Sequence, residues 1–344
     1  MPVLLGHHPA CLDHDPGPDH PERPVRLGAV RSGVAAAGVD DELVEFAAPA
    51  ATRAALARVH DLGYLYRLEE ASFVGDALDP DTIVGPGSYE AALRAAGAGL
   101  EAIERLDRGE GSSAFLAVRP PGHHARPAAA MGFCLCNNLA VATAALVARG
   151  ERVLVLDWDA HHGNGTQEMF YAEPEVLFVS FHEYPAYPGT GAVTETGAGP
   201  GLGTTINVPF PPGTPGDAYR LAFDEVVVPA AEQFSPSWLL VSAGFDAHRA
   251  DPITDLGLTA GDFADLTRRA MLLAPPGRRI LFLEGGYDLD ALAASAGATV
   301  AALAGIDYRP EPASWGDLGT AGDEGGPAAV VGAARALHER LVGG

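Results

Sequence analysis

The sequence predicts a single α/β domain in which helices cover both faces of a central parallel sheet. Short apolar runs recur along the 344 residues, and stretches of helical periodicity separate most of them. No internal repeat, low-complexity linker or block of charge divides the chain, so we expect one domain over residues 1–344. Hydrophobic residues make up 47% of the sequence, which is enough to bury a large core.

The apolar runs are the expected strands. Several of them are apolar at consecutive positions, which is typical of strands buried on both faces of a sheet. The runs cover residues 3–7, 114–118, 152–158, 176–181, 204–210, 238–244 and 279–285.

The segments between these runs are rich in alanine and leucine at helical spacing. Strands that alternate with helices in this way should run parallel. The expected helices cover residues 88–107, 136–149, 215–233, 259–274, 288–304 and, last, about 327–342. Residues 195–203 and 211–216 are expected to be loops, and residues 309–326 form a polar segment before the last helix.

The charge of the chain excludes some classes of partner. The 45 acidic and 22 basic residues give a formal charge of −23, and every basic residue is an arginine. An acidic chain without a basic run is not expected to bind nucleic acid or anionic lipid through phosphate contacts. The same charge is compatible with a cationic amine as partner.

The cysteines and the hydropathy pattern point to the cytoplasm. Cys11, Cys134 and Cys136 are too few for a disulfide framework and lack the spacing of a zinc ribbon. The N-terminus lacks the basic and apolar regions of a signal peptide. No window approaches the roughly 18 apolar residues of a membrane span. We therefore expect a soluble cytoplasmic protein, which could form oligomers.

Four of the expected strands lead directly into polar residues. In open parallel sheets, ligands bind beyond the carboxyl ends of the strands, so these residues should meet at one rim. They are His123–His124 after 114–118, Asp157–Gly165 after 152–156, Asp246–His248 after 238–244, and Tyr287 after 279–285.

Three of these residues form a candidate site for a divalent metal. Asp159 and His161 lie in one extended tip, and Asp246 follows a later strand. Carboxylates and imidazole are ligands of zinc, and three protein ligands would leave a position for water, as in a catalytic site. The alternative is that Asp157 and Asp159 are helix N-caps or loop residues and that the histidines are packed in the core. The number of such residues at strand ends favours the metal.

Two carboxylates and a neutral imidazole leave a zinc site with a net charge near zero. Such a site acidifies water less than three histidines do, so a separate general base is expected. His123 and His124 suit that role, with Asp157 holding one ring and Asn164 the other. The carboxylate partner should make its histidine the more basic of the two. Tyr287 could donate its hydroxyl to an oxyanion.

Five strings of the sequence resemble, in order and spacing, the zinc-dependent histone deacetylase superfamily. They are RPPGHHA (119–125), GFCLCNN (132–138), DWDAHHGNGTQ (157–167), VSAGFDAH (241–248) and EGGY (284–287). The tryptophan of DWD and the SAGFDA string look like the class II branch and its bacterial relatives. HPERPVRL (20–27) and DPDTIVGPGSYEAALRA (79–95) also look like that branch, so the resemblance covers about residues 5–305.

This resemblance implies an arginase/deacetylase-type fold and a role for each matching residue. Asp159, His161 and Asp246 would bind zinc. His124 would be the proton shuttle and His123 its electrostatic partner, and Tyr287 would polarise the acyl carbonyl. A potassium ion, which the family also implies, would use Asp157, Asp159, His161, Ser180 and Phe181, the last three through backbone or hydroxyl oxygens.

The resemblance also implies a channel for the acyl-lysine chain. Gly132 and Phe133 fall where the family lines this channel, and so does Tyr187, which replaces a typical phenylalanine. Asp81 lies near the position that binds the substrate backbone. Ile253 stands where relatives that act on polyamines place an acidic gate, which favours lysine as the substrate. Cys136 replaces a common aromatic residue, with little expected consequence.

The expected function is hydrolysis of N-acetylated amines, most concretely acetyl-lysine side chains of proteins. Zinc would activate a water, a histidine would take its proton and return it to the leaving amine, and Tyr287 and zinc would share the oxyanion. The alternatives are an acetylpolyamine deacetylase with the same chemistry, a binuclear manganese ureohydrolase, and an inactive binding module. The sequence does not choose between zinc and iron.

Overall fold

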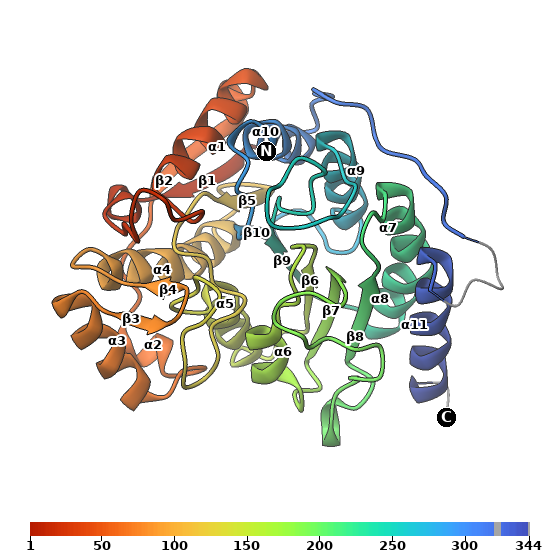
Figure 1. The fold of residues 1–344 in the computed structure, drawn as a ribbon, viewed down its shortest axis with the longest axis horizontal. Coiled ribbons are helices and arrows are strands. Elements are labelled where there is room, and N and C mark those ends of the chain that lie inside the picture. The colour runs from red at the N-terminus through yellow and green to blue at the C-terminus, as the bar shows by residue number, and fades with distance from the viewer. Residues whose placement is uncertain (320–324, 343–344) are drawn as a thin grey trace.

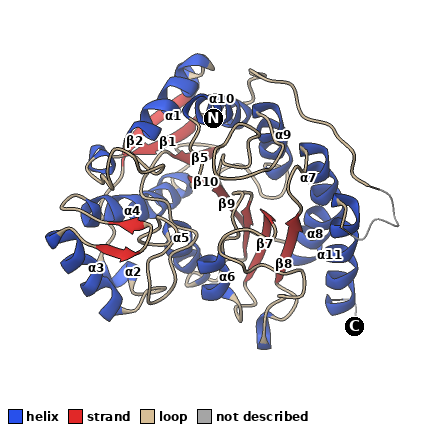
Figure 2. Cartoon of the chain, viewed as in Figure 1, coloured by secondary structure: helices blue, strands red, loops and turns tan. Residues whose placement is uncertain are grey.

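The computed structural model describes residues 1–319 and 325–342. Within them, eight strands form one sheet in the order β2-β1-β5-β10-β9-β6-β7-β8, and all neighbouring pairs are parallel (Figures 1 and 2). Helices pack around the sheet, so the predicted fold class is confirmed. None of the described helices is long and apolar enough to span a membrane.

All of the predicted strands are present. The sheet consists of β1 (Val3–His7), β2 (Leu43–Ala47), β5 (Ser113–Leu116), β6 (Val153–Asp157), β7 (Val176–Glu183), β8 (Thr205–Phe210), β9 (Trp238–Ala243) and β10 (Arg279–Leu283). Every residue of β6 and β9 is buried, which explains their uninterrupted apolar sequences. Strand β2, at the sheet edge, and a small antiparallel hairpin of β3 (Ala77–Asp79) and β4 (Thr82–Ile83) were not predicted.

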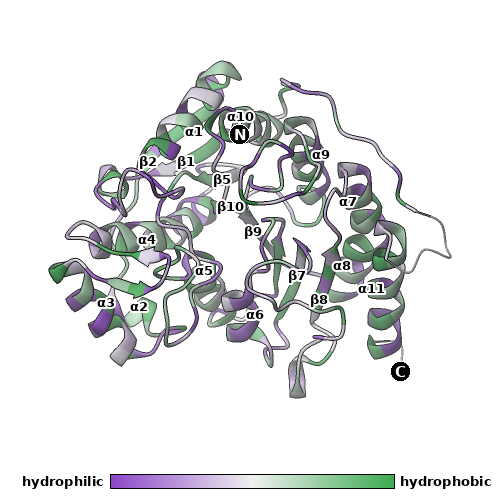
Figure 3. Ribbon diagram, in the orientation of Figure 1, coloured by the Kyte–Doolittle hydropathy of each residue, from purple (hydrophilic) through white to green (hydrophobic). Residues whose placement is uncertain are grey.

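The helices lie on both faces of the sheet. They are α1 (Val25–Ala36), α2 (Arg53–Leu56), α3 (Leu62–Val74), α4 (Ser88–Asp107), α5 (Asn138–Val147), α6 (Asn164–Phe170), α7 (Gly216–Ala222), α8 (Val228–Phe234), α9 (Ala260–Ala270), α10 (Leu289–Ala304) and α11 (Pro327–Val342). In Figure 1, α1, α9 and α10 pack side by side, while α4 and α5 form a separate pair. Figure 3 shows green and purple sides on several outer helices, as expected for amphipathic helices that cover a sheet.

One predicted helix differs in detail, and the predicted loop at 195–203 contains a 3-10 turn, Gly199–Gly201. The helix expected at 215–233 is divided into α7 and α8 by one π-helical turn, Phe223–Val227. The polar segment 309–326 contains no helix or strand at residues 309–319 or 325–326, and the rest of it lies outside the described residues.

The four strands with polar carboxyl ends are neighbours in the sheet. Strands β5, β10, β9 and β6 are consecutive and occupy its centre. Their carboxyl ends therefore bring together segments that are far apart in the sequence. This is the edge at which ligands bind in open parallel sheets.

Candidate active site

A pocket of about 290 Å³ opens at the carboxyl ends of the central strands. Its walls combine residues from both predicted sets, the catalytic residues and the channel residues. Lining it are Asp81, Pro121, His123, His124, Gly132, Phe133, Cys134, His161, Tyr187, Ile253, Gly285 and Tyr287.

Asp159, His161 and Asp246 converge on one point. One potential ligand atom of each residue lies within 4.8 Å of those of the other two. His161 Nδ1 is 3.2 Å from Asp159 Oδ1 and 3.0 Å from Asp246 Oδ2. The second oxygen of each carboxylate accepts a backbone N–H, from Gly285 to Asp159 at 2.8 Å and from Ala160 to Asp246 at 2.8 Å. These amides hold the carboxylates so that their other oxygens face the imidazole.

The three side chains have the chemistry of a divalent cation site. A ring nitrogen carries at most one hydrogen, so His161 Nδ1 cannot donate a full hydrogen bond to both carboxylates. Both carboxylates are buried, and no arginine pairs with either of them among the residues that the structure describes. His123, 3.8 Å from Asp159, offsets part of the cost of burying two carboxylates together, and a divalent cation between them would offset it more fully. Two oxygens and one nitrogen suit zinc.

Glycine is required next to this group. Gly285 follows β10 and lies against both carboxylates. A Cβ atom at Gly285 would lie 2.1 Å from Asp246 Oδ2 and 2.7 Å from Asp159 Oδ2. Any larger residue would displace the candidate metal ligands.

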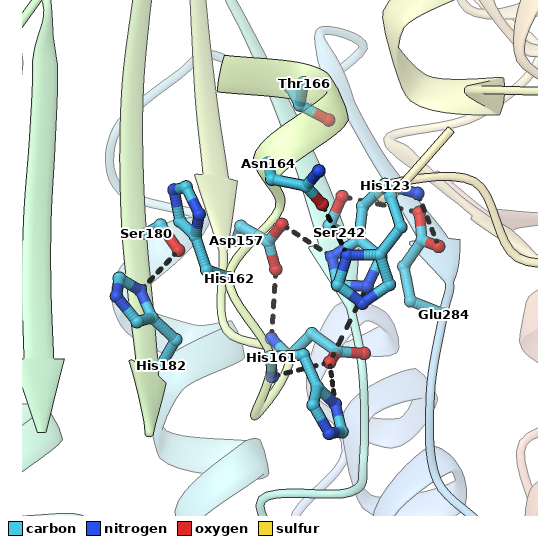
Figure 4. A network of polar contacts seen from close by, with 12 residues as sticks. His123, Asp157, His161, His162, Asn164, Thr166, Ser180, His182, Ser242 and Glu284 are labelled. Carbon is cyan, nitrogen blue, oxygen red and sulfur yellow. Dashed lines mark hydrogen bonds and ion pairs between the residues drawn. The ribbon is translucent and has the colours of Figure 1, made fainter. Parts of the chain in front are cut away.

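The two histidines of the pair have different partners. His123 Nδ1 donates to Asp157 Oδ2 at 3.0 Å (Figure 4). His124 Nδ1 lies 2.7 Å from Asn164 Oδ1. The ring centroids of the two histidines are 4.0 Å apart. Asn164 is the first residue of α6, and Asp157 is the last residue of β6. The expected pairing of one histidine with a carboxylate and the other with an amide is therefore present.

The pKa values of the two histidines are shifted in opposite directions. Burial would lower the pKa of His123, but the carboxylates of Asp159 and Asp157 outweigh it and raise this pKa to about 10. Burial and the neighbouring His123 and His161 hold the pKa of His124 well below its ordinary value. The surroundings of His123 therefore favour its protonated form, and those of His124 favour its neutral form.

Tyr287 reaches the pocket from the end of β10. Its backbone N–H donates to Asp251 Oδ2 at 2.7 Å, and the guanidinium of Arg26 lies 5.0 Å from its ring centroid. The next residue, Asp288, caps α10 by accepting from the Ala291 N–H. Burial raises the pKa of the Tyr287 phenol well above its usual range, and Arg26 opposes this effect in part. The hydroxyl therefore keeps its proton and remains a hydrogen-bond donor.

Aromatic side chains form the walls of the pocket. Tyr187 packs edge-on against His124, with centroids 5.1 Å apart, and Phe133 packs edge-on against Tyr287 at 5.8 Å. Gly132 has a φ of 55° and Phe133 a φ of 66°, both in the left-handed region. A Cβ at Gly132 would lie 2.5 Å from His124 Cδ2, so this position requires glycine.

The two remaining channel residues lie at the pocket mouth. Asp81 sits in the turn of the β3–β4 hairpin, where its carbonyl oxygen is 3.0 Å from His20 Nε2. Burial, together with Asp79, raises the pKa of the Asp81 carboxyl. Ile253 is 41% exposed and presents an apolar side chain to the opening.

Two of the residues expected to hold potassium, Ser180 and Phe181, lie on β7, outside the lining of the pocket. Ser180 pairs in register with Asp157 across the β6–β7 ladder, and Phe181 follows it on β7. The Ser180 hydroxyl lies 2.9 Å from His182 Nδ1. The binding of potassium stays a prediction.

The comparisons with known proteins give the family. Residues 20–303 match the histone deacetylase domain family. The chain belongs to the histone deacetylase family. It is 41% identical over 307 residues to a "probable deacetylase" of Archaeoglobus fulgidus, which covers 87% of this chain and 86% of that protein. It is 40% identical over 275 residues to a "histone deacetylase-like amidohydrolase" of Pseudomonas aeruginosa, covering 78% and 72%.

A solved structure of the same family has the same fold. A crystal structure described as the HDA15 HD domain superposes with a TM-score of 0.89 at 35% identity, covering 99% of this deacetylase-family chain and 95% of the other. The protein is therefore a hydrolase of the deacetylase or amidohydrolase type, and its family is metal-dependent.

The ureohydrolase alternative needs carboxylates that bridge two metals. Among the described residues, the candidate metal groups are Asp159–His161–Asp246 and His123–Cys134–Glu284, and they share no residue. No carboxylate therefore belongs to both groups, as a bridging ligand would. The family match also places the chain among deacetylases.

Sequence reasoning assigned no role to several buried charged residues near the site. Glu22 is buried and forms a bidentate pair with Arg119, with both nitrogen–oxygen distances at 2.5–2.6 Å. Arg26 also pairs with Glu22 and donates to the carbonyls of Glu284 and Gly286. Glu284 is buried beside His123. The signal was available, because these residues lie within the HPERPVRL, RPPGHHA and EGGY strings.

Proposed function

We propose that this chain is a zinc-dependent deacetylase that removes acetyl groups from N-acetylated amines, with acetyl-lysine side chains of proteins as its preferred substrates. One observation carries the proposal. A histidine paired with the Asp157 carboxylate and a histidine paired with the Asn164 amide line, together with His161 and Tyr287, the pocket beside the Asp159–His161–Asp246 group. This combination supplies a base, an acid and an oxyanion donor for amide hydrolysis.

A zinc ion held by Asp159, His161 and Asp246 would act as a Lewis acid toward the acetyl carbonyl and lower the pKa of a water in the pocket. Neutral His124, oriented by Asn164, takes the proton of the attacking water and later gives it to the leaving amine. His123, kept protonated by Asp157, stabilises negative charge. The Tyr287 hydroxyl donates to the carbonyl oxygen as that oxygen becomes an oxyanion.

The pocket walls support a lysine side chain as the carrier of the acetyl group. Phe133 and Tyr187 provide aromatic surface for an alkyl stem and exclude water from it. Asp81 at the mouth can accept a hydrogen bond from the substrate backbone. Ile253 offers no carboxylate at the mouth for the second amine of a polyamine.

A substrate panel tests the proposal. Initial rates are measured for an acetyl-lysine peptide, acetylspermidine and acetylputrescine with the zinc-loaded enzyme. We expect the highest kcat/KM with the peptide. Faster turnover of the polyamines would overturn the substrate class, and no turnover of any acetylated amine would overturn the proposed function.

A substitution at Ile253 tests whether this residue sets the substrate preference. Ile253→Glu places a carboxylate at the pocket mouth without touching the histidine pair or the metal ligands. It should raise kcat/KM for acetylspermidine by ~10-fold and lower the preference for the peptide. An unchanged ratio of the two rates would show that Ile253 does not select the substrate.

The predicted potassium site forms a separate part of the proposal. Ser180 and Phe181 on β7, together with Asp157, Asp159 and His161, would hold the ion and stabilise the loop that carries the metal ligands. Replacing potassium by N-methylglucamine in the assay should change kcat. An identical kcat in both salts would remove this site from the proposal.

A further inference from the structure

Glu284 has no assigned role, although its carboxylate contacts the backbone of His123 and although Tyr287 follows it by three residues. Its side chain is 0% exposed, and no arginine forms an ion pair with it in the part of the chain that the structure describes. A buried carboxylate is costly unless hydrogen bonds compensate for its lost hydration. The hydrogen bonds that Glu284 makes therefore indicate what it does.

The hydrogen bonds of Glu284 run to the neighbouring strands. Oε2 accepts the backbone N–H of Gly122 at 2.6 Å and that of His123 at 3.2 Å, and Oε1 lies 3.4 Å from the Ser242 hydroxyl. In the sheet, β10, which precedes Glu284, lies between β5 and β9. One carboxylate therefore spans three strand ends. Figure 4 shows His123 between Asp157 and Glu284.

The sequence after β5 explains why these two amides are used. Pro120 and Pro121 carry no N–H, so Gly122 and His123 offer the first amides after the proline pair. Gly122 also needs to lack a side chain, because a Cβ there would lie 2.6 Å from the Asn138 nitrogen. The backbone that carries the histidine pair is thus held from one side by Glu284.

The segment that follows Glu284 is held just as firmly. Gly285 N–H donates to the candidate metal ligand Asp159, and Arg26 donates to the carbonyl of Gly286 at 2.7 Å. Tyr287 comes directly after this segment. Because Glu284 fixes the end of β10 relative to Gly122 and His123, it also fixes the position of Tyr287 relative to the histidine pair.

We infer that Glu284 is a positioning residue, whose carboxylate sets the separation between the histidine pair and Tyr287. The inference rests on the proposed function, because it assigns these groups to the same reaction. Glu284 is not among the residues that line the pocket. It acts through the backbone of Gly122 and His123, and misplacing a catalytic group by about 1 Å can cost ~100-fold in rate.

The test compares Glu284→Ala with the conservative Glu284→Gln. The amide oxygen of glutamine can still accept the Gly122 and His123 N–H groups, whereas alanine cannot. We expect kcat to fall by ~100-fold in Glu284→Ala and by ~10-fold or less in Glu284→Gln, with KM within ~3-fold and metal content unchanged in both. Equal losses in the two variants, or lost metal, would overturn the positioning role.

Asp262→Ala provides the matched control. Asp262 is also buried and accepts backbone amides, from Thr259 and Ser314, but it does not line the pocket. It should lower thermal stability while leaving kcat within ~2-fold of the wild type. A comparable loss of kcat in this control would show that the effect of Glu284 is one of general stability.

Hydrogen exchange supplies a readout that needs no substrate. Amides in peptides covering residues 119–126 should exchange faster in Glu284→Ala than in the wild type, and not in Asp262→Ala. Unchanged exchange would overturn the inference even if the enzyme is active. A wild type without turnover, with exchange altered as expected, would instead overturn the proposed function and leave the contact as structural.

Discussion

At the scale of single residues, the two histidines of the pair differ in their hydrogen-bond partners and in the direction in which their pKa values are shifted. His123 and His124 are adjacent in the sequence, yet one pairs with a buried carboxylate and the other with an amide. The pKa of Asp157 is also shifted: burial raises it to about 6, and the neighbouring His123 opposes this rise. The chemistry therefore depends on Asp157 and Asn164 as much as on the rings that they hold.

The Tyr287 hydroxyl is expected to act only as the oxyanion forms. Tyr287→Phe removes the hydroxyl and keeps the ring that packs against Phe133 and Arg26. We predict a ~100-fold loss of kcat with little change in KM, because the lost hydrogen bond belongs to the transition state. Steady-state kinetics on an acetyl-lysine peptide, with metal content measured alongside, provides the check. A variant with full activity would contradict the role of Tyr287.

Substitution of a proposed metal ligand should lower metal binding, which Tyr287→Phe should leave unchanged. Asp246→Asn keeps an oxygen for the Ala160 N–H but removes a ligand charge, so zinc affinity should fall by more than ~100-fold. Elemental analysis after dialysis against a chelator measures this, with Asp262→Asn as the control. Zinc retained at one ion per chain would exclude Asp246 as a ligand.

Although Asp246→Asn should weaken zinc binding, it should increase the stability of the metal-free protein. Burial, and next the charge of Asp159, raise the pKa of Asp246. A carboxyl with a raised pKa costs stability at pH values above its unfolded pKa, so removing it stabilises the metal-free protein at pH 7. Thermal unfolding in excess chelator should therefore give a higher Tm for Asp246→Asn than for the wild type.

At the scale of elements, the sequence predicted the strands that are buried on both faces, but it did not predict the edge strand β2 or the glycine-containing helix α1. The buried central strands were found because they are apolar at every position. Strand β2 was missed because it is an edge strand with Val44 and Glu45 exposed. Helix α1 was missed because it contains Gly28 and Gly33, which weaken a helical pattern. Gly33 is needed for close packing on α10, since a Cβ there would lie 1.8 Å from the Ala293 carbonyl oxygen.

The candidate site shows the same division between pattern and packing. The convergence of the candidate ligands and the histidine pair at one edge was predictable, because these residues follow strands and lie in recognisable strings. The contact of Glu284 with Gly122 and His123 was not predictable from sequence alone. It depends on β10 lying next to β5 in the sheet, although β10 follows β5 by more than 160 residues in the chain.

One buried histidine links two elements around the site and should make stability depend on pH. His60 Nε2 accepts the Asn137 N–H at the start of α5, and its Nδ1 lies 3.0 Å from the Arg126 carbonyl oxygen. Burial lowers the pKa of His60 to about 4, although hydrogen bonding to the Arg126 and Pro127 backbone favours the protonated ring and partly opposes this effect. The unfolded chain thus binds the proton more tightly, so stability is lost as pH falls from 6.5 toward 4.

His60→Gln should reduce this pH dependence. Glutamine can accept and donate at the same two positions but does not titrate. We predict that the wild type loses about 1–2 kcal/mol more of its unfolding free energy than the variant between pH 7 and pH 5. Urea unfolding at the two pH values measures the difference. Parallel losses in both proteins would show that His60 is not responsible.

At the scale of the whole molecule, the absence of lysine and the charge of −23 acquire a meaning that composition alone did not have. On the proposed function, a lysine deacetylase would have no lysine side chain of its own to be acetylated. The acidity agrees with a substrate that becomes cationic on deacetylation, since the product amine carries a charge at pH 7. Long-range attraction should therefore speed the encounter with basic peptides.

Ionic strength tests this long-range contribution. For a basic acetyl-lysine peptide, we predict that kcat/KM falls by ~10-fold as salt rises from about 0.02 to 0.5 M, because the Debye length shortens from roughly 20 Å to about 4 Å. An uncharged acetyl-lysine derivative should change by less than ~2-fold over the same range, because only the encounter is steered. Asp81→Asn isolates the charge at the pocket mouth. If the salt dependence is unchanged in that variant, the attraction comes from the whole surface, and if both substrates respond alike, electrostatic steering does not contribute.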